Sequence, residues 1–382
     1  MYETINFVNR EKDAAFFIDS LVGKRPVFVL VIGTTETAKI PGITAAGKSV
    51  ETVDKTPATD AEVLLLDRPR CVNEVPTTPD NVPTPAIYSL AAVRRANFPV
   101  VIVNSGVKIR PKVPFFDVGG EANNDGGADI RTGNAMKREV VENIIWKSKV
   151  LGKNLAKMAD YALIGESVPA GTTTALAVME ALGIEAADTI GADAYSTYTP
   201  KNLINLKRRV VAQGMKAAGI TFGSMGNDPI GAVSAFGDPT IPAKIGLALG
   251  FIKAKKPTIL AGSTINAPVL ALLKHMSDKP EENVLIASTS YVPEKDLKIL
   301  VTRIIDLPII SIDLCLHLSR HEKIRAYSKG AMKEGAGAGG AALAALLKSR
   351  GKITIHDLRT EMEKIYEELL NWEKTIKQQK QK

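Results

Sequence analysis

Short apolar runs rich in Val and Ile recur along the chain, and a stretch of helical character follows most of them. This alternation is typical of a parallel sheet that is covered by helices on both faces. The expected strands are residues 27–32, 63–66, 100–103, 161–164, 220–222, 258–260, 284–287 and 309–312. The clearest expected helices are 134–158, 174–182, 203–218 and 242–253. The sequence therefore predicts an α/β fold with a doubly wound, mostly parallel sheet.

The length of the chain and the spread of its charges narrow the classes of protein to consider. A chain of 382 residues is long for one average domain, so we expect one large domain with a smaller companion. The net charge of +8 is dispersed, apart from Lys207-Arg208-Arg209 and the tail 377–382, and aromatic residues make up 5%. So few aromatic residues disfavour a nucleic-acid interface, where bases stack on aromatic rings. We expect small-molecule substrates and no nucleic-acid partner.

The N-terminal residues and the cysteine content indicate the cellular compartment in which we expect the protein. Charged residues are scattered through the first twenty positions, which does not fit a secretion signal. No run of roughly eighteen apolar residues, the length that crosses a membrane, occurs in the sequence. The two cysteines, Cys71 and Cys315, argue against a disulfide framework. We therefore expect a soluble, cytoplasmic protein that makes no membrane contact.

Two loops and a C-terminal helix complete the expected organisation. Residues 76–85 contain four prolines and residues 119–133 five glycines, so both are expected to be loops near the working edge of the sheet. From Ile355 onward apolar residues recur at helical spacing, which predicts a long amphipathic helix. Its apolar stripe is covered either by the same chain or by a dimer partner, and periodicity alone does not choose between them. We expect the last six residues to be disordered.

A possible phosphate site follows the expected strand 161–164. The segment after it contains Gly165, Glu166, Gly171, Thr172 and Thr173 and runs into a helix. A helix N-terminus presents free backbone N–H groups and a positive dipole end to an anion. A merely N-capped helix would have similar threonines, but it would not need a carboxylate at the strand tip, where open α/β sheets bind ligands. We predict that this segment holds a phosphate.

A second glycine-rich segment carries a carboxylate at its start. Gly335 and Gly337 are two of four glycines within six residues, and Glu334 precedes them. Ordering so many glycines costs conformational entropy, so we expect the backbone to approach another group closely here. A flexible turn with a solvated glutamate is the plainer alternative. Lys207, on an expected helix, would join this edge as a phosphate partner only if the sheet brings it close.

Residues 42–49, Gly-Ile-Thr-Ala-Ala-Gly-Lys-Ser, match the phosphate-loop pattern of nucleotide hydrolases. The apolar run 63–66 followed by Asp67 resembles the strand that binds Mg²⁺ in such proteins. However, the expected strand 27–32 ends about nine residues before Gly42. The β-branched residues and Pro57 that follow Lys48 would also end a helix early. A phosphate-loop NTPase is therefore an alternative, but the motif lacks its usual context.

Two further site types find little support in the sequence. Cys315, His317, His321 and Glu322 cluster, but the two histidines lack the intervening glutamate of a zinc-protease helix. Unliganded surface histidines are the preferred interpretation, so we predict no metal site. No three-glycine dinucleotide fingerprint follows a strand, which disfavours a nicotinamide-dependent dehydrogenase. We expect the protein to need no cofactor.

The two glycine segments, taken together and in order, resemble a known family. Glu334-Gly335-Ala336-Gly337-Ala338 and the segment from Gly165-Glu166 to Gly171-Thr172-Thr173 lie about 170 residues apart. They are similar to motifs of the nicotinate-nucleotide:dimethylbenzimidazole phosphoribosyltransferase family, in its archaeal branch. The resemblance covers roughly residues 158–350 and includes Gly237-Asp238-Pro239 and the segment 259–264. The chain departs from the better-known bacterial pattern at Val168-Pro169, Lys333 and Ala336.

The resemblance implies a three-layer α/β domain, residues 26–350, and a small helical domain built from residues 1–25 and 351–382. It also implies a homodimer. Within the site, it implies that Glu334 is the catalytic base, with Gly335 and Gly337 beside it. Glu166 and the turn after it, with Gly171, Thr172 and Thr173, would bind the phosphate, and Lys207 falls near the family's phosphate-binding lysine.

The activity that the resemblance implies is transfer of a phosphoribosyl group from nicotinate mononucleotide to a benzimidazole-type base. The product would be an alpha-ribazole phosphate, the lower-ligand nucleotide of cobamides. A buried carboxylate can stabilise the cationic sugar and accept the proton of the attacking base. Besides the phosphate-loop NTPase, a protein that binds nucleotide or base without turnover remains an alternative. The sequence does not identify the acceptor base.

Overall fold

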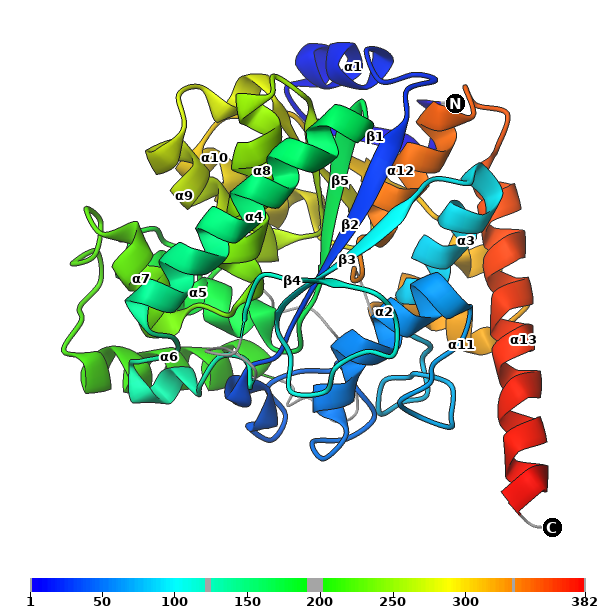
Figure 1. Ribbon diagram of the computed structural model, residues 1–382, viewed down its shortest axis with the longest axis horizontal. Helices are drawn as coiled ribbons and strands as arrows, with labels where there is room; N and C mark the ends of the chain where they lie inside the picture. The colour runs from blue at the N-terminus through cyan, green and yellow to red at the C-terminus, as the bar shows by residue number, and fades with distance from the viewer. Residues whose placement is uncertain (1, 121–124, 191–201, 332–333, 381–382) are drawn as a thin grey trace.

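A single mixed sheet forms the centre of the molecule (Figure 1). The computed structural model describes residues 2–120, 125–190, 202–331 and 334–380. In these ranges the sheet has eight strands in the order β1-β8-β7-β6-β5-β2-β3-β4. All neighbours pair in parallel except β1, which is antiparallel to β8. The strands are β1 (Ile5–Asn9), β2 (Pro26–Gly33), β3 (Val100–Gly106), β4 (Phe116–Asp117), β5 (Tyr161–Ser167), β6 (Thr258–Ala261), β7 (Val284–Thr289) and β8 (Ile309–Ile312).

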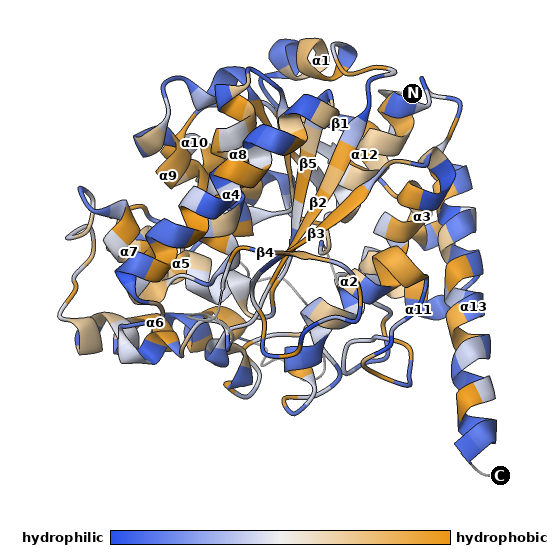
Figure 2. Cartoon of the chain, in the orientation of Figure 1, coloured by the Kyte–Doolittle hydropathy of each residue, from blue (hydrophilic) through white to orange (hydrophobic). Residues whose placement is uncertain are grey.

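Helices cover both faces of this sheet, which confirms the expected three-layer α/β fold. Alternate residues of β2 belong to different apolar clusters, because successive side chains of a strand point to opposite faces. Val29 packs with α4 (Arg138–Met158) and α8 (Thr240–Lys253), whereas Leu30 packs with α3 (Ala86–Ala96) and α12 (Ala338–Lys348). Figure 2 shows apolar residues along β2 and β3 and polar ones on the outer side of α4.

The remaining helices extend these two outer layers. They are α1 (Glu11–Asp19), α2 (Thr56–Leu66), α5 (Gly171–Ala181), α6 (Leu203–Ala218), α7 (Pro229–Phe236), α9 (Ala267–Met276), α10 (Glu294–Ile304), α11 (Glu322–Arg325) and α13 (Ile355–Lys380). The four helices expected at 134–158, 174–182, 203–218 and 242–253 correspond to α4, α5, α6 and α8. Six of the expected strands are present as well, as β2, β3, β5, β6, β7 and β8.

Two expected strands are wrong. Residues 63–66 lie in α2, which has Pro57 in its first turn and packs against α3. A short apolar run cannot by itself distinguish a buried helical segment from a strand. Residues 220–222 follow the left-handed C-cap Gly219 of α6 and form no strand, and the Phe222 side chain is exposed. The short strands β1 and β4 were not expected.

The ends of the chain lie against the α/β layers. β1 pairs with β8 at one edge of the central sheet. The apolar stripe of α13 is buried in the same cluster as α3, and Arg94 of α3 forms ion pairs with Glu361 and Glu368. The chain itself therefore covers this stripe. The separate helical domain of residues 1–25 and 351–382 remains a prediction, although β1 belongs to the sheet of the larger unit.

The last turns of α13 differ from the expectation for the tail. α13 continues to Lys380, so disorder was wrongly predicted for residues 377–380, while residues 381–382 lie outside the described part. In the portion of the chain that the structure covers, no helix combines the length and apolar character needed to cross a bilayer.

The order of the strands determines where a ligand can bind. From β2 the chain leads to β3 and β4 on one side, and from β5 it continues through β6, β7 and β8 on the other. The direction of winding thus reverses between β2 and β5. In open α/β sheets a crevice forms at the carboxyl ends of the strands at such a reversal.

Candidate active site

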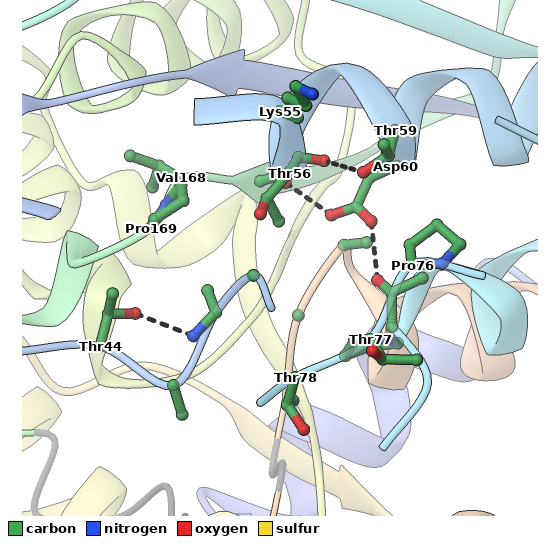
Figure 3. Close-up of a pocket in the computed structure, with 18 of the residues that line it drawn as sticks. Thr44, Lys55, Thr56, Thr59, Asp60, Pro76, Thr77, Thr78, Val168 and Pro169 are labelled. Carbon is green, nitrogen blue, oxygen red and sulfur yellow. Dashed lines mark hydrogen bonds between the residues drawn. The ribbon is translucent and has the colours of Figure 1, made fainter. Parts of the chain in front are cut away.

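A pocket of about 220 Å³ lies at the carboxyl ends of β5 and β6. Its walls come from segments that are far apart in the sequence: residues 44–48, the start of α2, the proline-rich loop 76–85, the turn from Glu166 to Thr172, and Glu334 to Ala336. The proline-rich loop therefore does lie at the working edge of the sheet, as expected. Figure 3 shows how several of these segments surround the cavity.

Glu334 lines this pocket, and backbone groups hold its carboxylate. The N–H of Thr289, at the end of β7, donates to Oε2 at 2.7 Å. The N–H of Gly335 donates to Oε1 at 3.1 Å, and that of Gly339 donates to both oxygens at 3.3 Å. Burial raises the pKa of Glu334 to about 7, with these N–H groups opposing the shift and the Glu166 carboxylate adding to it. Such a group can accept a proton near neutral pH.

The two glycine segments of the sequence meet directly. The N–H of Ala336 donates to the carbonyl of Glu166 at 3.2 Å. A Cβ atom at Gly165 would lie 2.9 Å from Cα of Gly337, so the backbones touch at a distance that only glycine permits. Gly337 itself has φ +72, the left-handed conformation that glycine adopts without strain. Because these glycines have no side chain, the end of β5 and the segment that leads into α12 approach each other closely. This contact is the structural reason for glycines whose ordering costs entropy.

Glu166 lines the pocket and belongs to a buried ion pair that the sequence did not predict. Nζ of Lys244, on α8, donates to Oε2 of Glu166 at 2.9 Å and to Oδ1 of Asn266 at 3.0 Å. The Lys244 side chain is 0% exposed and that of Glu166 is 6% exposed. Burial raises the pKa of Glu166, and the Lys244 ammonium opposes this shift. The only sequence signal for Lys244 is a single lysine within an otherwise apolar helical run.

The cationic end of the site lies at the N-terminus of α5. Gly171 and Thr172 line the pocket, and Nζ of the buried Lys207 donates to Thr172 Oγ1 at 2.8 Å. The hydroxyl of Thr173 is buried and has no hydrogen-bond partner among the described residues. The fold thus brings Lys207 to the N-terminus of α5. This meets the condition under which the sequence predicted Lys207 to be a phosphate partner. Helix dipole and ammonium both favour an anion at this position.

A further carboxyl group in the pocket wall, that of Asp60 in α2, was also missed. Asp60 Oδ1 accepts a hydrogen bond from Thr84 at 2.7 Å, and Oδ2 accepts one from Ser167 at 2.6 Å. Burial raises the pKa of Asp60 to about 6. The sequence did not indicate Asp60 as a site residue. The expected strand at 63–66 also hid the fact that Asp60 lies on a helix, α2.

The phosphate-loop motif does not have the structure of a phosphate loop. β2 ends at Gly33, and no helix begins at Lys48 in this described segment. Lys48 pairs with Glu74, and Asp67 caps the end of α2 and pairs with Arg94. Residues 44–48 nevertheless line the pocket. These residues form part of the pocket wall, but they lack the arrangement of strand, loop and helix that binds a nucleoside triphosphate in a phosphate loop.

Of the two histidines in the expected cluster, His317 is exposed and His321 contacts α13. His321 lies 2.9 Å from Glu367 and makes an edge contact with the ring of Tyr366. Within the described ranges no group of three or more His, Cys, Asp or Glu side chains is arranged to hold a metal ion. Lys333, one of the departures from the bacterial pattern, lies outside the described residues, whereas Val168 and Pro169 line the pocket.

Comparison with known proteins agrees with this geometry. A family model described as "Phosphoribosyltransferase" matches residues 85–317, more than half of the chain. The chain belongs to this phosphoribosyltransferase family. It is an α/β phosphoribosyltransferase, and the resemblance that its two glycine segments indicated is confirmed.

Archaeal relatives match nearly the whole chain. The UPF0284 protein of Archaeoglobus fulgidus is 39% identical over 367 residues, which are 96% of this chain and 99% of the relative. The UPF0284 protein of Sulfolobus acidocaldarius is 37% identical over 361 residues, 93% of this chain and 99% of the relative. The similarity to these archaeal proteins agrees with the archaeal branch that the sequence indicated.

Solved structures share the fold. The nicotinate-nucleotide-dimethylbenzimidazole phosphoribosyltransferase of Thermus thermophilus superposes with a TM-score of 0.62 at 17% identity. The match covers 90% of this chain and 88% of that one. At this identity the similarity establishes the architecture of the sheet and its helices.

Proposed function

We propose that this phosphoribosyltransferase moves the phosphoribosyl group of nicotinate mononucleotide to a benzimidazole-type base, with Glu334 as the base catalyst. The observation that carries the proposal is the Glu334 carboxylate, with a pKa raised to about 7, at the wall of a pocket whose other side is cationic. The product is an alpha-ribazole phosphate, the lower-ligand nucleotide of a cobamide. The solved Thermus thermophilus enzyme carries both substrates in its name, which supports this choice.

The reaction requires one bond to break and one to form at the same carbon. A ring nitrogen of the acceptor base attacks C1 of the ribose, and the nicotinate nitrogen leaves with the bonding electron pair. The departing pyridine is neutral at its nitrogen and needs no proton, so no general acid is required. The acceptor becomes cationic until its second nitrogen loses a proton, and Glu334 accepts it. The same carboxylate stabilises positive charge on the sugar during the displacement.

The other residues position the nucleotide for this displacement. The 5′-phosphate lies at the N-terminus of α5, where Gly171, Thr172, Thr173 and Lys207 provide N–H groups, hydroxyls and a cation. Glu166 lines the same pocket, and its ion pair with Lys244 fixes its orientation. Holding both reactants in line removes most of the entropy cost of a bimolecular step.

Product analysis tests the proposal. The purified protein is incubated with nicotinate mononucleotide and benzimidazole, and release of nicotinate and formation of the riboside phosphate are followed by chromatography. Lys207→Met should raise KM for nicotinate mononucleotide at least roughly tenfold, since a charge-assisted hydrogen bond is lost. Lys216→Met, which changes an exposed lysine on the same helix, is the matched control. Absence of product with every base tried would reject the activity.

A further inference from the structure

Asp60 has unused capacity to accept hydrogen bonds from a ligand. A carboxylate offers about four acceptor positions, and two hydroxyl donors, Thr84 and Ser167, occupy one position on each oxygen. Over the ranges that the structure describes, no cation lies within ion-pair distance of Asp60. The side chain is buried, with 4% of the residue exposed, yet it belongs to the pocket wall. A buried charge held by two hydroxyls alone is stabilised by any further donor that enters the pocket.

The neighbours of Asp60 place it close to the catalytic carboxylate. Ser167, which donates to Asp60, is the residue after Glu166. On the other oxygen, Thr84 precedes Pro85, and Pro85 packs on Gly335, where a Cβ would meet its ring at 3.0 Å. The buried phenol of Tyr327 has its pKa raised by burial and by both Asp60 and Glu334. Asp60 therefore faces the same part of the pocket as Glu334.

Charges of both signs line the pocket. The α5 N-terminus, beside Lys207, attracts anions, and Lys48 and Lys55 also belong to the lining. Asp60 and Glu334 add carboxyl groups to the wall, and these repel a phosphate or the carboxylate of nicotinate from their immediate surroundings. The group that meets Asp60 is therefore the neutral acceptor base, and it meets an acceptor of hydrogen bonds.

We propose that the acceptor is an aromatic base with an amino or hydroxyl group on its six-membered ring, and that Asp60 accepts the hydrogen bond from this group. This inference rests on the proposed phosphoribosyl transfer. The wall around Asp60 is polar: Thr56, Thr59, Thr77 and Thr78 line it (Figure 3). The buried hydroxyl of Thr77 has no partner among the described residues, so a polar substituent could also pair with it. A dimethyl-substituted ring would offer no donor to the remaining acceptor positions of Asp60 and no partner to the Thr77 hydroxyl.

The test compares acceptors of similar size. Initial rates are measured with 5-hydroxy-, 5-amino-, 5-methyl- and 5-methoxybenzimidazole at saturating nicotinate mononucleotide. The hydroxyl and amino compounds should exceed the methyl compound in kcat/KM by roughly ten- to hundredfold, the usual effect of a hydrogen bond to a charged group. The methoxy compound, which accepts but does not donate, should be no better than the methyl compound.

Two variants link the preference to Asp60. Asp60→Asn keeps the shape and can still pair with both hydroxyls, and it should reduce the preference for donor groups by roughly tenfold. Asp67→Asn, at the exposed C-cap of the same helix, should leave the preference unchanged. If Asp60→Asn does not fold, the wild-type preference alone decides.

The outcomes separate this inference from the proposed function. Equal kcat/KM for methyl and hydroxyl compounds would overturn the inference while leaving the transferase activity intact. A change in KM for nicotinate mononucleotide that is the same for every acceptor would assign Asp60 to the donor nucleotide and also overturn it. Absence of turnover with all four bases would instead refute the proposed function.

Discussion

Replacing Glu334 by Gln should greatly reduce turnover. It should also change the pH dependence of stability, so that the variant gains stability relative to wild type as the pH rises. The loss of a general base typically costs a factor of 10² to 10⁴, and the negative charge facing the sugar cation is lost as well. We expect kcat to fall by at least about a thousandfold, or about 4 kcal/mol in the barrier. Nicotinate mononucleotide should still bind, because the cationic end of the pocket is unchanged.

The stability effect follows from the raised pKa. Glu334 has its pKa raised from 4.5 to about 7 in the folded chain. Folding therefore favours the protonated form, so its contribution to stability is fully present below about pH 4.5 and is lost as pH rises through about 7. Between about pH 5 and pH 8.5 this amounts to about 2.5 kcal/mol of lost stability. A glutamine does not titrate, so the Glu334→Gln variant does not lose this stability as the pH rises.

The amide also carries a cost that does not depend on pH. Both carboxylate oxygens accept backbone N–H groups, from Thr289, Gly335 and Gly339. The Gln NH₂ group must face at least one of these donors, which costs about 1–3 kcal/mol. The variant should thus be the less stable protein at pH 5, and the difference should shrink or reverse by pH 8.5.

Urea denaturation at the two pH values measures this change. Glu322→Gln, an exposed site, controls for the simple loss of a carboxylate. Because all other groups titrate in both proteins, their contributions cancel in the difference. A difference between wild type and Glu334→Gln that does not change with pH would refute the raised pKa, and turnover near the wild-type rate would remove Glu334 from the role of base.

Three further outcomes are expected. Lys244→Met leaves Glu166 buried without its cation, so unfolding free energy should fall by about 3–5 kcal/mol; Lys244→Met with Glu166→Gln should recover part of this loss in denaturation, without restoring turnover. Gly165→Ala places a methyl group 2.9 Å from the Gly337 backbone, so kcat/KM should drop at least about tenfold as the two segments separate. ATP and GTP hydrolysis with Mg²⁺ should stay at background, and hydrolysis abolished by Lys48→Ala would instead revive the phosphate-loop alternative.

The strands of this fold were predictable wherever burial on both faces made the sequence continuously apolar. β2 and β5 are such strands, and their Val, Ile and Leu runs have no other simple interpretation. The run 63–66 has the same composition but is only four residues long, and a helix that packs one side against α3 needs apolar residues too. Pro57 is the residue that distinguishes a helix from a strand here, because proline favours the first turn of a helix and lies shortly before residues 63–66.

The candidate site was predictable to the extent that it depends on backbone geometry. Glycines at 165 and 337 signal a close approach, and that approach exists. Lys244 and Asp60 act through their side chains alone, from the interiors of α8 and α2; the position of Lys244 in an apolar helical run is its one local signal, and Asp60 has none. Their partners, Glu166 and Ser167, are 78 and 107 positions away in the chain, so only the folded sheet reveals the pairs.

The arrangement of charges explains why Glu334 needs a raised pKa and Glu166 needs a cation. Two carboxyl groups that line one pocket disfavour each other's ionisation, and the Glu166 carboxylate raises the pKa of Glu334. Lys244 pairs with Glu166, whereas the hydrogen bonds that the described residues donate to the Glu334 carboxylate all come from neutral N–H groups. Glu334 is thereby left as the group that takes up a proton near neutral pH. Removing the Lys244 charge should therefore shift the pH at which turnover rises, an effect that a purely structural lysine would not produce.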